Sequence, residues 1–593
     1  MKYTHNNNEL RLKDINKKVG LRGWVSRKRN LGGLIFIDLR DMHGITQLVV
    51  APENENYETA QMLRNEYVIE VEGKVIERVS KNKNMPTGDI EIEVIKLNLL
   101  SKAENPPMII QNETDALEEF RLKYRYLDLR RPVQQNYLIK RSQIVQSIRT
   151  SLINNGFLEI ETPILSKSTP EGARDYLVPS RLHEGEFYAL PQSPQIYKQL
   201  LMISGFEKYY QIAKCFRDED LRSDRQPEFT QVDIEGAFVS EEDIFKYIED
   251  LFYNLFKDVM KMEIEVPFLK MKYDDAISKY GSDKPEMRFA NLIESYNYLI
   301  REDIPLFNGV DHVRGIVFEN AQSITRRVID SLTEVVKKNH GDALAFVRHN
   351  GSEVTGSIAK FLNEDDLAKI NLKKDEILFL VPGKYENVSK ALGALRLEVA
   401  KLLDLIPEND YKFLWVTDWP LLEYDSEEER FYAAHHPFTA PKSVEDLKNN
   451  PKEVRARAYD IVLNGYEVGG GSIRIHNQDV QQLMFETLGL SNEDIKERFG
   501  FFVEALKYGT PPHGGIALGL DRIVMILTNT TNIRDVIAFP KTQNARDIMN
   551  QSPSSVELEQ LEELHIKVSK NEKNWLYILG WIFHGCCKTI CTP

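Results

Sequence analysis

Arginines and carboxylates alternate between Phe216 and Glu235, in a stretch whose residue types suit phosphate chemistry. Around the expected turn the charged residues are Arg217, Asp218, Glu219, Asp220, Arg222, Asp224, Arg225 and Glu228. Alternating apolar residues on both sides predict two antiparallel strands joined by a turn. Guanidinium groups bind phosphate oxygens bidentately, and aromatic rings or guanidinium planes stack on purines. The hairpin therefore suits a nucleoside triphosphate, and a solvated, salt-bridged hairpin is the alternative interpretation.

Two further segments have a recognisable order of glycine, proline and apolar residues. Near the C-terminal end, the glycine-rich residues 514–522 precede an apolar run, which predicts a strand-to-helix turn with Arg522 at the helix start. Upstream, apolar residues recur with a helical period from Gln134 to Asn155. Phe157 to Pro163 then predict a strand that the proline ends.

Length and composition indicate a soluble protein of several domains. The 593 residues suggest three or four domains, and 42% hydrophobic with 28% charged residues is ordinary for globular proteins. No segment approaches the ~20 apolar residues that span a bilayer, and the N-terminus lacks the apolar region of a signal peptide. Four cysteines do not support a disulfide framework. We therefore expect a cytoplasmic protein that does not contact membranes.

The net charge of −14 is unevenly distributed along the chain. Residues 11–30 are rich in lysine and arginine and contain a single acid, Asp14. A basic N-terminal face on an otherwise acidic protein offers a binding surface to nucleic-acid phosphates and repels them elsewhere.

Five short alternating segments predict a small closed barrel of the OB type at the N-terminus, a fold that binds single-stranded nucleic acid. They are Val19–Arg27, Leu34–Leu39, Ile45–Val50, Val68–Glu77 and Asp89–Leu97. On the barrel face, Phe36 could stack on an unpaired base, while Gln47 and Arg27 could bond base edges and backbone. The alternative is that Phe36 belongs to the barrel core.

The three segments described first resemble, in type and order, the signature motifs of class II aminoacyl-tRNA synthetases. They are the helix and strand before Pro163, the hairpin with Arg217 and Phe229, and the turn with Arg522. The barrel and an extra segment from Met287 to Leu405 are similar to the bacterial-type aspartyl-tRNA synthetases. The resemblance implies an α+β fold: an antiparallel catalytic sheet, an N-terminal OB barrel and an α/β insertion domain.

The resemblance also implies domain boundaries. We expect an anticodon-binding barrel at 1–104, a linker at 105–132, the catalytic domain at 133–286 and 406–568, a GAD-type insertion domain at 287–405, and an atypical tail at 569–593. The basic-aromatic segment Arg121–Pro132 suits either tRNA contact or domain packing. In the tail, His584, Cys586, Cys587 and Cys591 offer metal ligands, but a metal-free added segment is the preferred interpretation.

The activity that the resemblance implies is ligation of L-aspartate to tRNA(Asp) through an aspartyl-adenylate, with ATP as substrate and Mg²⁺ as cofactor. Catalytic roles fall to Arg217, Glu219 and Arg522. Aspartate-binding residues are Glu171, Gln195, Lys198, Arg217, Asp233, His435, His436 and Arg474. ATP-binding residues are Arg217, Asp218, Glu219, Gln226, Phe229, Gln231, Glu467, Gly519, Leu520, Asp521 and Arg522. Glu467 is the metal ligand, and Arg27, Leu31, Phe36 and Gln47 are the tRNA-binding residues.

Several of these roles follow from side-chain chemistry once the resemblance is accepted. Arg474 suits bidentate binding of the substrate's side-chain carboxylate, although it could instead pair with a structural acid. Phe229 and the plane of Arg522 could hold adenine between them. His435 is expected to help hold the substrate carboxylate. A metal site is not favoured, because no further ligands lie at zinc spacing, and a core histidine is the other alternative.

Two alternatives to the strict activity remain at the level of the sequence. One is a relaxed enzyme that also charges tRNA(Asn), and the other is an inactive tRNA-binding paralogue. Leu31 and Lys81, in loops beside the anticodon face, favour the strict form. The first motif resembles the segment that forms the two-fold interface in class II enzymes, so a homodimer is expected.

Overall fold

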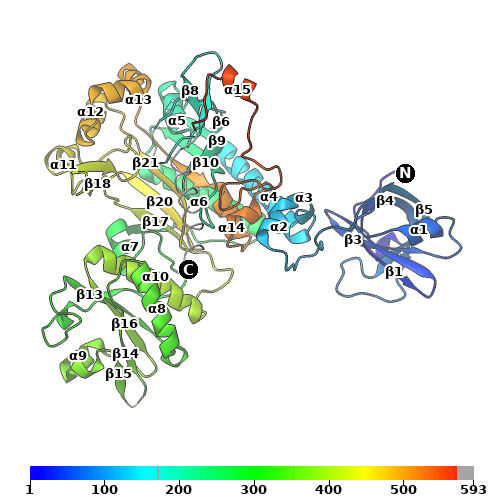
Figure 1. The fold of residues 1–593 in the computed structure, drawn as a ribbon, viewed down its shortest axis with the longest axis horizontal. Helices are drawn as coiled ribbons and strands as arrows, with labels where there is room; N and C mark the ends of the chain where they lie inside the picture. The colour runs from blue at the N-terminus through cyan, green and yellow to red at the C-terminus, as the bar shows by residue number, and fades with distance from the viewer. Residues whose placement is uncertain (170–172, 352, 570–593) are drawn as a thin grey trace, which may run out of the picture.

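The computed structural model describes residues 1–169, 173–351 and 353–569. Figure 1 shows an elongated molecule with a small barrel at one end, a large central sheet, and a second α/β unit below that sheet. The tail predicted at 569–593, with its candidate metal ligands, lies outside the described residues from 570 onward. Within the described part, no helix combines the length and the apolar character that crossing a membrane requires.

The barrel at the N-terminus has the five strands that the alternation predicts. They are β1 (Lys18–Leu31), β2 (Leu34–Asp41), β3 (Gly44–Val50), β4 (Val68–Glu77) and β5 (Ile90–Ser101), closed in the order β1-β2-β3-β5-β4, with the short α1 (Tyr57–Met62). Ile35, Ile37 and Leu39 alternate into the core, where they are 0–1% exposed. Phe36 lies on the outer side of β2 and is only partly buried, so its interpretation as a core residue is wrong.

The central sheet has eight strands and is antiparallel except at its two edges. In spatial order they are β11 (Leu269–Lys272), β17 (Phe413–Thr417), β20 (Ala458–Leu463), β21 (Tyr466–Ile473), β22 (His513–Gly519), β10 (Glu228–Ala237), β9 (Lys208–Phe216) and β6 (Leu158–Glu159). Helices α4 (Pro132–Asn154), α6 (Glu241–Leu255) and α14 (Leu520–Leu527) pack on it and complete the largest apolar core. The predicted hairpin and strand-to-helix turn thus lie side by side, as β9, β10, β22 and α14.

The strand of the first motif is shorter than predicted. Only Leu158 and Glu159 pair with β9, and the last ladder bond is donated by Ile160 N–H to Tyr210 O at 3.1 Å. The chain leaves the sheet before Pro163, which has no N–H to donate. Strand β6 is therefore the free edge of the sheet, and Leu158 on it is 54% exposed.

The segment between the second and third motifs forms a separate five-stranded sheet with its own apolar cores. Its strands are β12 (Glu294–Ser295), β13 (His312–Phe318), β14 (Ala345–His349), β15 (Val354–Gly356) and β16 (Ile377–Gly383), in the order β12-β13-β16-β14-β15. Its helices are α8 (Arg326–Lys338), α9 (Glu364–Ile370) and α10 (Tyr385–Leu402). Helix α7 (Tyr273–Tyr280) precedes this unit, and α10 packs against α7.

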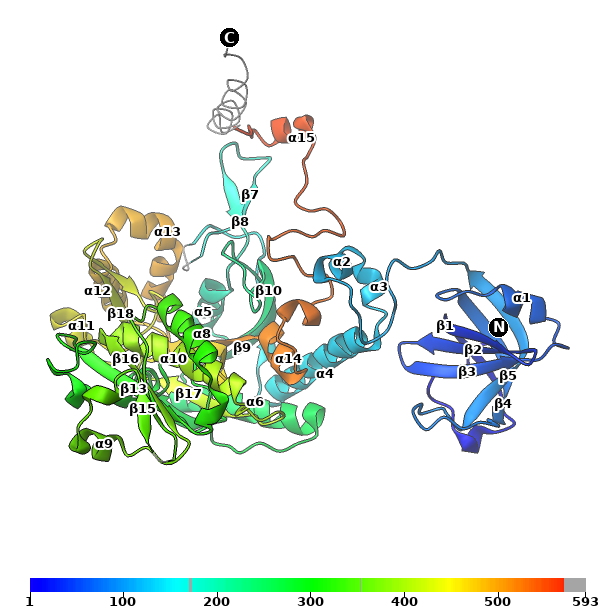
Figure 2. The same cartoon turned by 60° about the horizontal axis from the view of Figure 1, so that its bottom comes forward.

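The remaining helices and strands lie around the central sheet (Figure 2). They are α5 (Gln195–Ile203), β7 (Leu177–Pro179), β8 (Phe187–Ala189), β18 (Leu422–Asp425), β19 (Arg430–Ala433), α11 (Val444–Asn449), α12 (Gln478–Thr487), α13 (Asn492–Ala505) and α15 (Leu558–Glu563). Two short helices, α2 (Glu118–Lys123) and α3 (Arg125–Asp128), form the second half of the linker between the barrel and the central sheet.

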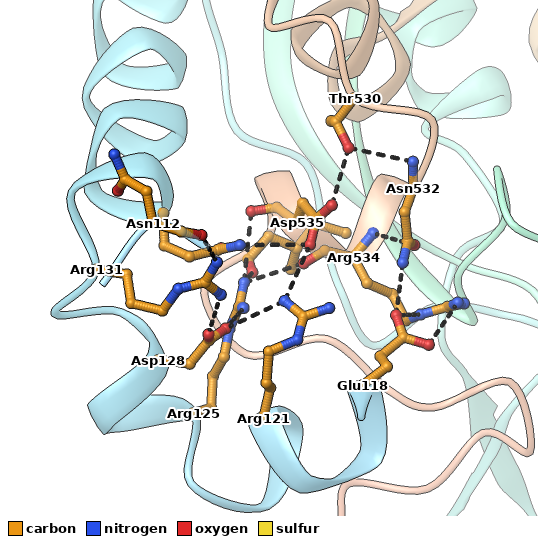
Figure 3. Close-up of polar contacts among 12 residues, drawn as sticks. Asn112, Glu118, Arg121, Arg125, Asp128, Arg131, Thr530, Asn532, Arg534 and Asp535 are labelled. Carbon is orange, nitrogen blue, oxygen red and sulfur yellow. Dashed lines mark hydrogen bonds and ion pairs between the residues drawn. The ribbon is translucent and has the colours of Figure 1, made fainter. Parts of the chain in front are cut away.

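The basic segment Arg121–Pro132 of the linker packs against the domain of the central sheet, as its interpretation as a domain-packing segment requires. Arg125 is 2% exposed and donates to the backbone oxygens of Ala538 at 3.0 Å and Ile537 at 2.9 Å (Figure 3). It also pairs with Asp128 at 2.6 Å. Beside it, Glu118 accepts two bonds from Arg534, at 2.8 and 3.0 Å. These guanidinium groups therefore hold the linker to the segment that follows α14.

Replacing Arg125 by methionine tests this role of the linker. The variant keeps most of the apolar volume but removes one of the two arginines bonded to Asp128, which keeps Arg131, and the donor to several carbonyl oxygens. Because removing one partner of a buried ion pair costs about 3–5 kcal/mol, we expect the free energy of unfolding to fall by about that amount. Urea denaturation followed by circular dichroism measures the change.

Lys123→Met is the matched control, since Lys123 lies on the same short linker but is exposed. Its unfolding free energy should stay within about 0.5 kcal/mol of the parent protein. An Arg125→Met variant as stable as this control would contradict the packing role.

Candidate active site

A cleft of about 270 Å³ opens where the second and third motifs meet. Its walls include Arg217, Glu219, Gln226, Phe229, Gln231, Glu467, Gly519, Asp521 and Arg522, nine of the eleven residues predicted to bind ATP. The other two lie outside the cleft. Leu520 is 1% exposed in the apolar core, and Asp218 pairs with Arg174 near the surface.

Arg217 and Phe229 contact each other inside this cleft. The guanidinium carbon of Arg217 lies 5.2 Å from the centre of the Phe229 ring, a cation–π distance. Arg522 also lines the cleft. It donates to the backbone oxygen of Glu467 at 2.5 Å and to the carboxylate of Asp224 at 3.2 Å. Within the described chain, the Nε atoms of Arg217 and Arg522 are buried and have no hydrogen-bond partner. The cleft thus presents two arginines and an aromatic face, which suits a purine nucleotide.

Two of the predicted ATP residues have structural partners. Asp521 accepts from the Thr230 N–H at 2.7 Å and from Arg141 of α4 at 2.5 Å, so its carboxylate connects all three motifs. The Gln226 side chain exchanges two hydrogen bonds with the backbone of Lys541, at 2.8 and 3.1 Å. These contacts fix the cleft walls in position.

Four buried charges form a cluster further along strand β10, whose residues Phe229 and Gln231 line the cleft. Lys198 of α5 lies 3.1 Å from Asp233 and 3.5 Å from Glu235. Arg474 donates two parallel bonds to Glu235, at 2.9 and 3.1 Å, and a third to Ser472 at 2.7 Å. Arg474 therefore pairs with a structural acid in this structure, and two cations balance two carboxylates.

The four charges change one another's pKa values in different directions. Burial raises the pKa of Asp233 despite the nearby Lys198. Burial would do the same to Glu235, but Arg474 and Lys198 outweigh it and lower the pKa of that carboxyl. Glu235 thus stays ionised as the permanent partner of Arg474, while Asp233 is the carboxyl whose charge is least compensated.

Besides Arg217, three of the predicted aspartate-binding residues have a buried polar atom without a hydrogen-bond partner in the described part of the chain. Among the residues that the structure describes, Nε2 of Gln195, Oδ2 of Asp233 and Nε2 of His435 are buried without a hydrogen-bond partner. Buried polar atoms are rarely left unsatisfied, so each is a candidate ligand contact. Glu171, also predicted here, lies outside the described residues.

The adjacent histidines are neutral at physiological pH. Burial lowers the pKa of His435 to about 4, and burial together with nearby Arg474 and Lys198 lowers that of His436 to about 3. His435 packs edge-on against Trp419, with ring centres 4.7 Å apart. Within the described residues, no cluster of three or more histidine, cysteine or acidic side chains suits a metal ion. A neutral His435 can still donate one hydrogen bond to a substrate carboxylate.

Glu467 has a second carboxylate beside it that the sequence prediction did not include. Asp460 lies on the neighbouring strand β20 and is 6% exposed. Burial, with Glu467 and Asp283 close by, raises the pKa of Asp460 well above its ordinary value. The Glu467 carboxylate pairs with Lys284 at 3.2 Å. Two crowded carboxylates have the oxygen donors that a hard cation prefers.

Some site residues were missed because their signal is weak or absent. Glu235 continues the alternation of Gln231 and Asp233 along β10, so period 2 could have identified it. Asp460 could have been found from the Asn464-Gly465 turn, which predicts a hairpin pairing its strand with that of Glu467. No local pattern identifies Lys284, which reaches the cleft from a connection far away in sequence.

The predicted tRNA face of the barrel has both free and engaged side chains. Arg27 and Leu31 are exposed, and Phe36 is partly exposed beside them. Gln47 is 3% exposed: its oxygen accepts from Arg29 at 3.0 Å and from Arg78 at 2.6 Å, and its amide donates to Glu91 at 2.6 Å. The sequence prediction did not include these three partners, which fix the orientation of Gln47.

Family models match two parts of the chain. The model described as tRNA synthetases class II (D, K and N) matches residues 117–543, and the OB-fold nucleic acid binding domain matches residues 19–100. Among solved structures, the asparaginyl-tRNA synthetase of Pyrococcus horikoshii with asparaginyl-adenylate covers 91% of this chain and 99% of its own, at 20% identity and TM-score 0.59. The aspartyl-tRNA synthetase of Entamoeba histolytica covers 91% of both chains, at 21% identity and TM-score 0.57. These two likenesses concern the fold.

Relatives of much higher identity cover nearly the whole chain. The aspartate–tRNA(Asp/Asn) ligase of Bacillus cytotoxicus is 52% identical over 585 residues, which are 96% of this chain and 99% of that protein. The ligase of the same name from Anoxybacillus flavithermus is 51% identical, with the same coverage of both chains. Together with the family models and the fold, these matches identify the chain as a member of the class II aminoacyl-tRNA synthetases, in the family of bacterial aspartate–tRNA ligases.

Proposed function

We propose that this ligase is non-discriminating, charging both tRNA(Asp) and tRNA(Asn) with L-aspartate through an aspartyl-adenylate. The observation that carries this proposal is the name aspartate–tRNA(Asp/Asn) ligase of relatives 51–52% identical over 96% of the chain. The strict activity expected from Leu31 and Lys81 has less support. Lys81 pairs with Glu77 at 2.9 Å on the barrel surface, and this contact gives it no evident role in discrimination.

The cleft and the charged cluster divide the two small substrates between them. ATP lies in the cleft, with adenine between Phe229 and the Arg522 plane. Arg217 contacts both the α-phosphate and the attacking α-carboxylate. Glu219 is the second catalytic residue at this point of the cleft. Aspartate lies at the cluster, with its ammonium toward Asp233 and its side-chain carboxylate toward Arg474 and Lys198. The carboxylate oxygen attacks the α-phosphorus and pyrophosphate leaves, and positioning with electrostatic stabilisation carries such a nucleotidyl transfer.

Mg²⁺ would be held by Glu467, with Asp460 as a second ligand. The fit rests on the proximity of these two carboxylates: burial, with Glu467 and Asp283 nearby, raises the pKa of Asp460. When bound, the ion would neutralise phosphate charge. The protein's own contribution is to keep Glu467 ionised, since Lys284 and Arg522 outweigh burial and lower the pKa of its carboxyl.

The barrel would bind the anticodon on the face that carries Phe36, and the free sheet edge would form a homodimer. Both proposals rest on exposed apolar surface. Phe36 lies outside the barrel core, and Ile153, Leu158 and Leu165 near the edge strand are 51–59% exposed. A two-fold partner could cover these side chains with the same surface of its own. A cytoplasmic location accords with this role in protein synthesis.

Aminoacylation of both tRNA transcripts tests the proposed specificity. We expect [¹⁴C]aspartate to be attached to tRNA(Asp) and tRNA(Asn) with similar efficiency, and we expect Phe36→Ala to weaken both reactions. Loss of one stacked base costs about 1–3 kcal/mol of binding free energy. ATP–pyrophosphate exchange without tRNA should be unchanged in this variant, and Leu100→Ala, an exposed barrel residue, serves as control. Charging of tRNA(Asp) alone would establish the strict form instead.

Arg474→Lys tests the charged cluster. Leucine at this position would leave buried Glu235 with Lys198 alone, whereas lysine keeps the charge and removes the bidentate geometry. We expect kcat/KM for aspartate in pyrophosphate exchange to fall about 10- to 100-fold, because a charge-assisted hydrogen bond contributes about 1.5–3 kcal/mol. The control Arg457→Lys alters a similar pair with Glu241 outside the site. Equal kinetics for both variants would contradict the role of Arg474.

Leu158→Glu tests the dimer. The charge would enter the proposed interface, so light scattering should give twice the 68.6 kDa chain mass for the parent protein and a single chain mass for the variant. Leu182→Glu is the control, since Leu182 is 75% exposed between β7 and β8, outside the proposed interface. A parent protein that is active as a monomer would exclude this interface.

A further inference from the structure

The connection that leads into the insertion domain contributes a side chain to the ATP cleft. Residues 281–293 link α7 of the central body to β12 of the insertion. Lys284 lies in this link and lines the cleft, with its ammonium 3.2 Å from the Glu467 carboxylate. Lys284 therefore lies in the connection that leads to the insertion domain, and its side chain contacts the cleft.

Lys284 and Arg522 both contact Glu467. Arg522 donates to the backbone oxygen of Glu467, and Lys284 pairs with its carboxylate. Both cations line the same cleft, so together they attract an anion that enters it. The triphosphate of ATP is the substrate group that carries such a charge.

We propose that Lys284 binds the β- and γ-phosphates of ATP, beside Arg522, as a further substrate-binding residue of the adenylation reaction. This inference rests on the proposed assignment of the cleft to ATP. A lysine suits the role because its ammonium is a point charge on a flexible stem that can exchange one anionic partner for another. Without nucleotide it neutralises Glu467, and with nucleotide it turns to the phosphates while Glu467 becomes free for a cation.

Helix α10 of the insertion domain holds the link on both sides of Lys284. Before it, Gly281 (φ +66°) packs against Gly393, so closely that a Cβ on either glycine would overlap the backbone of the other. After it, Arg396 is 1% exposed and donates to the backbone oxygens of Glu286 and Phe289, both at 2.9 Å. Arg396 is thus a positioning residue, which acts on the nucleotide through Lys284.

Calorimetric titration of the full-length protein with ATP and with AMP, both with Mg²⁺, tests the contact. AMP has the adenine, the ribose and the α-phosphate but lacks the groups that Lys284 would bind. We expect Lys284→Met to raise the Kd for ATP about 10- to 100-fold, the usual range for a charge-assisted hydrogen bond, and to leave the Kd for AMP within twofold. Lys279→Met is the matched control, since Lys279 is an exposed lysine of α7 paired with Asp275 at 3.1 Å. It should change neither constant.

The same titration tests the positioning role of Arg396. Arg396→Lys should weaken the binding of ATP and leave the binding of AMP unchanged, as Lys284→Met does. Lys284→Arg should keep most of the ATP affinity that Lys284→Met loses. Unchanged ATP binding in Lys284→Met would overturn the proposal and leave Lys284 as a counter-ion of Glu467. Equal weakening of ATP and AMP would also overturn it, since it indicates a general disturbance of the cleft.

One further variant separates this inference from the assignment on which it rests. Arg522→Gln should also weaken ATP if the cleft is the nucleotide site. If ATP binding survives both Arg522→Gln and Lys284→Met, the assignment of the cleft itself is wrong. If only Arg522→Gln weakens ATP, the cleft binds ATP and the role of Lys284 alone is refuted.

Discussion

The geometry of the candidate active site depends on the hydrogen bonds that the Asp521 carboxylate accepts. This residue lies at the start of α14 and is 3% exposed. One oxygen accepts from the Thr230 N–H of β10, and the other accepts from Arg141 of α4. Residues from three distant parts of the chain are thereby fixed around one buried group. Since a buried charge is tolerated only when fully paired, none of the three can move without exposing an unsatisfied partner.

The buried cluster of Lys198, Asp233, Glu235 and Arg474 follows the same rule with four charges instead of two. Glu235 fixes Arg474 through two parallel bonds, so the guanidinium is already oriented before any substrate arrives. Lys198 and Asp233 complete the set. Preorganised charges do not have to reorient during the reaction, which is how electrostatic stabilisation becomes effective. In the function proposed above, the buried network that holds this cluster together also orients the charges that face the two carboxylates and the ammonium of aspartate.

Much of the fold could be predicted from the sequence, because its signals are local. Alternation with glycine turns predicted the five barrel strands, and the order of the three motifs predicted the central sheet. The site residues on those motifs were found for the same reason, and Arg217, Phe229 and Arg522 do line one cleft.

The errors and omissions concern long-range contacts. The first-motif strand was predicted too long, since a local pattern does not say where a strand loses its neighbour. Leu520 and Asp218 were included with their motifs and remain predictions; the Leu520 side chain lies in the core, and Asp218 pairs with Arg174 near the surface. Lys284 was missed because its partner Glu467 lies on the other side of the insertion domain in sequence. Only the tertiary structure brings such residues together.

The order of strands in the central sheet has a consequence for synthesis on the ribosome. Strand β10 lies between β9 and β22, and the whole insertion domain is translated between β10 and β22. The barrel and the insertion each have a separate core, so each can fold as soon as its own residues emerge. Strand β10 must instead wait with one edge unpaired, and an unpaired edge is open to association with other chains. The nascent catalytic sheet is therefore the part of this protein that most needs protection by chaperones until β22 has been made.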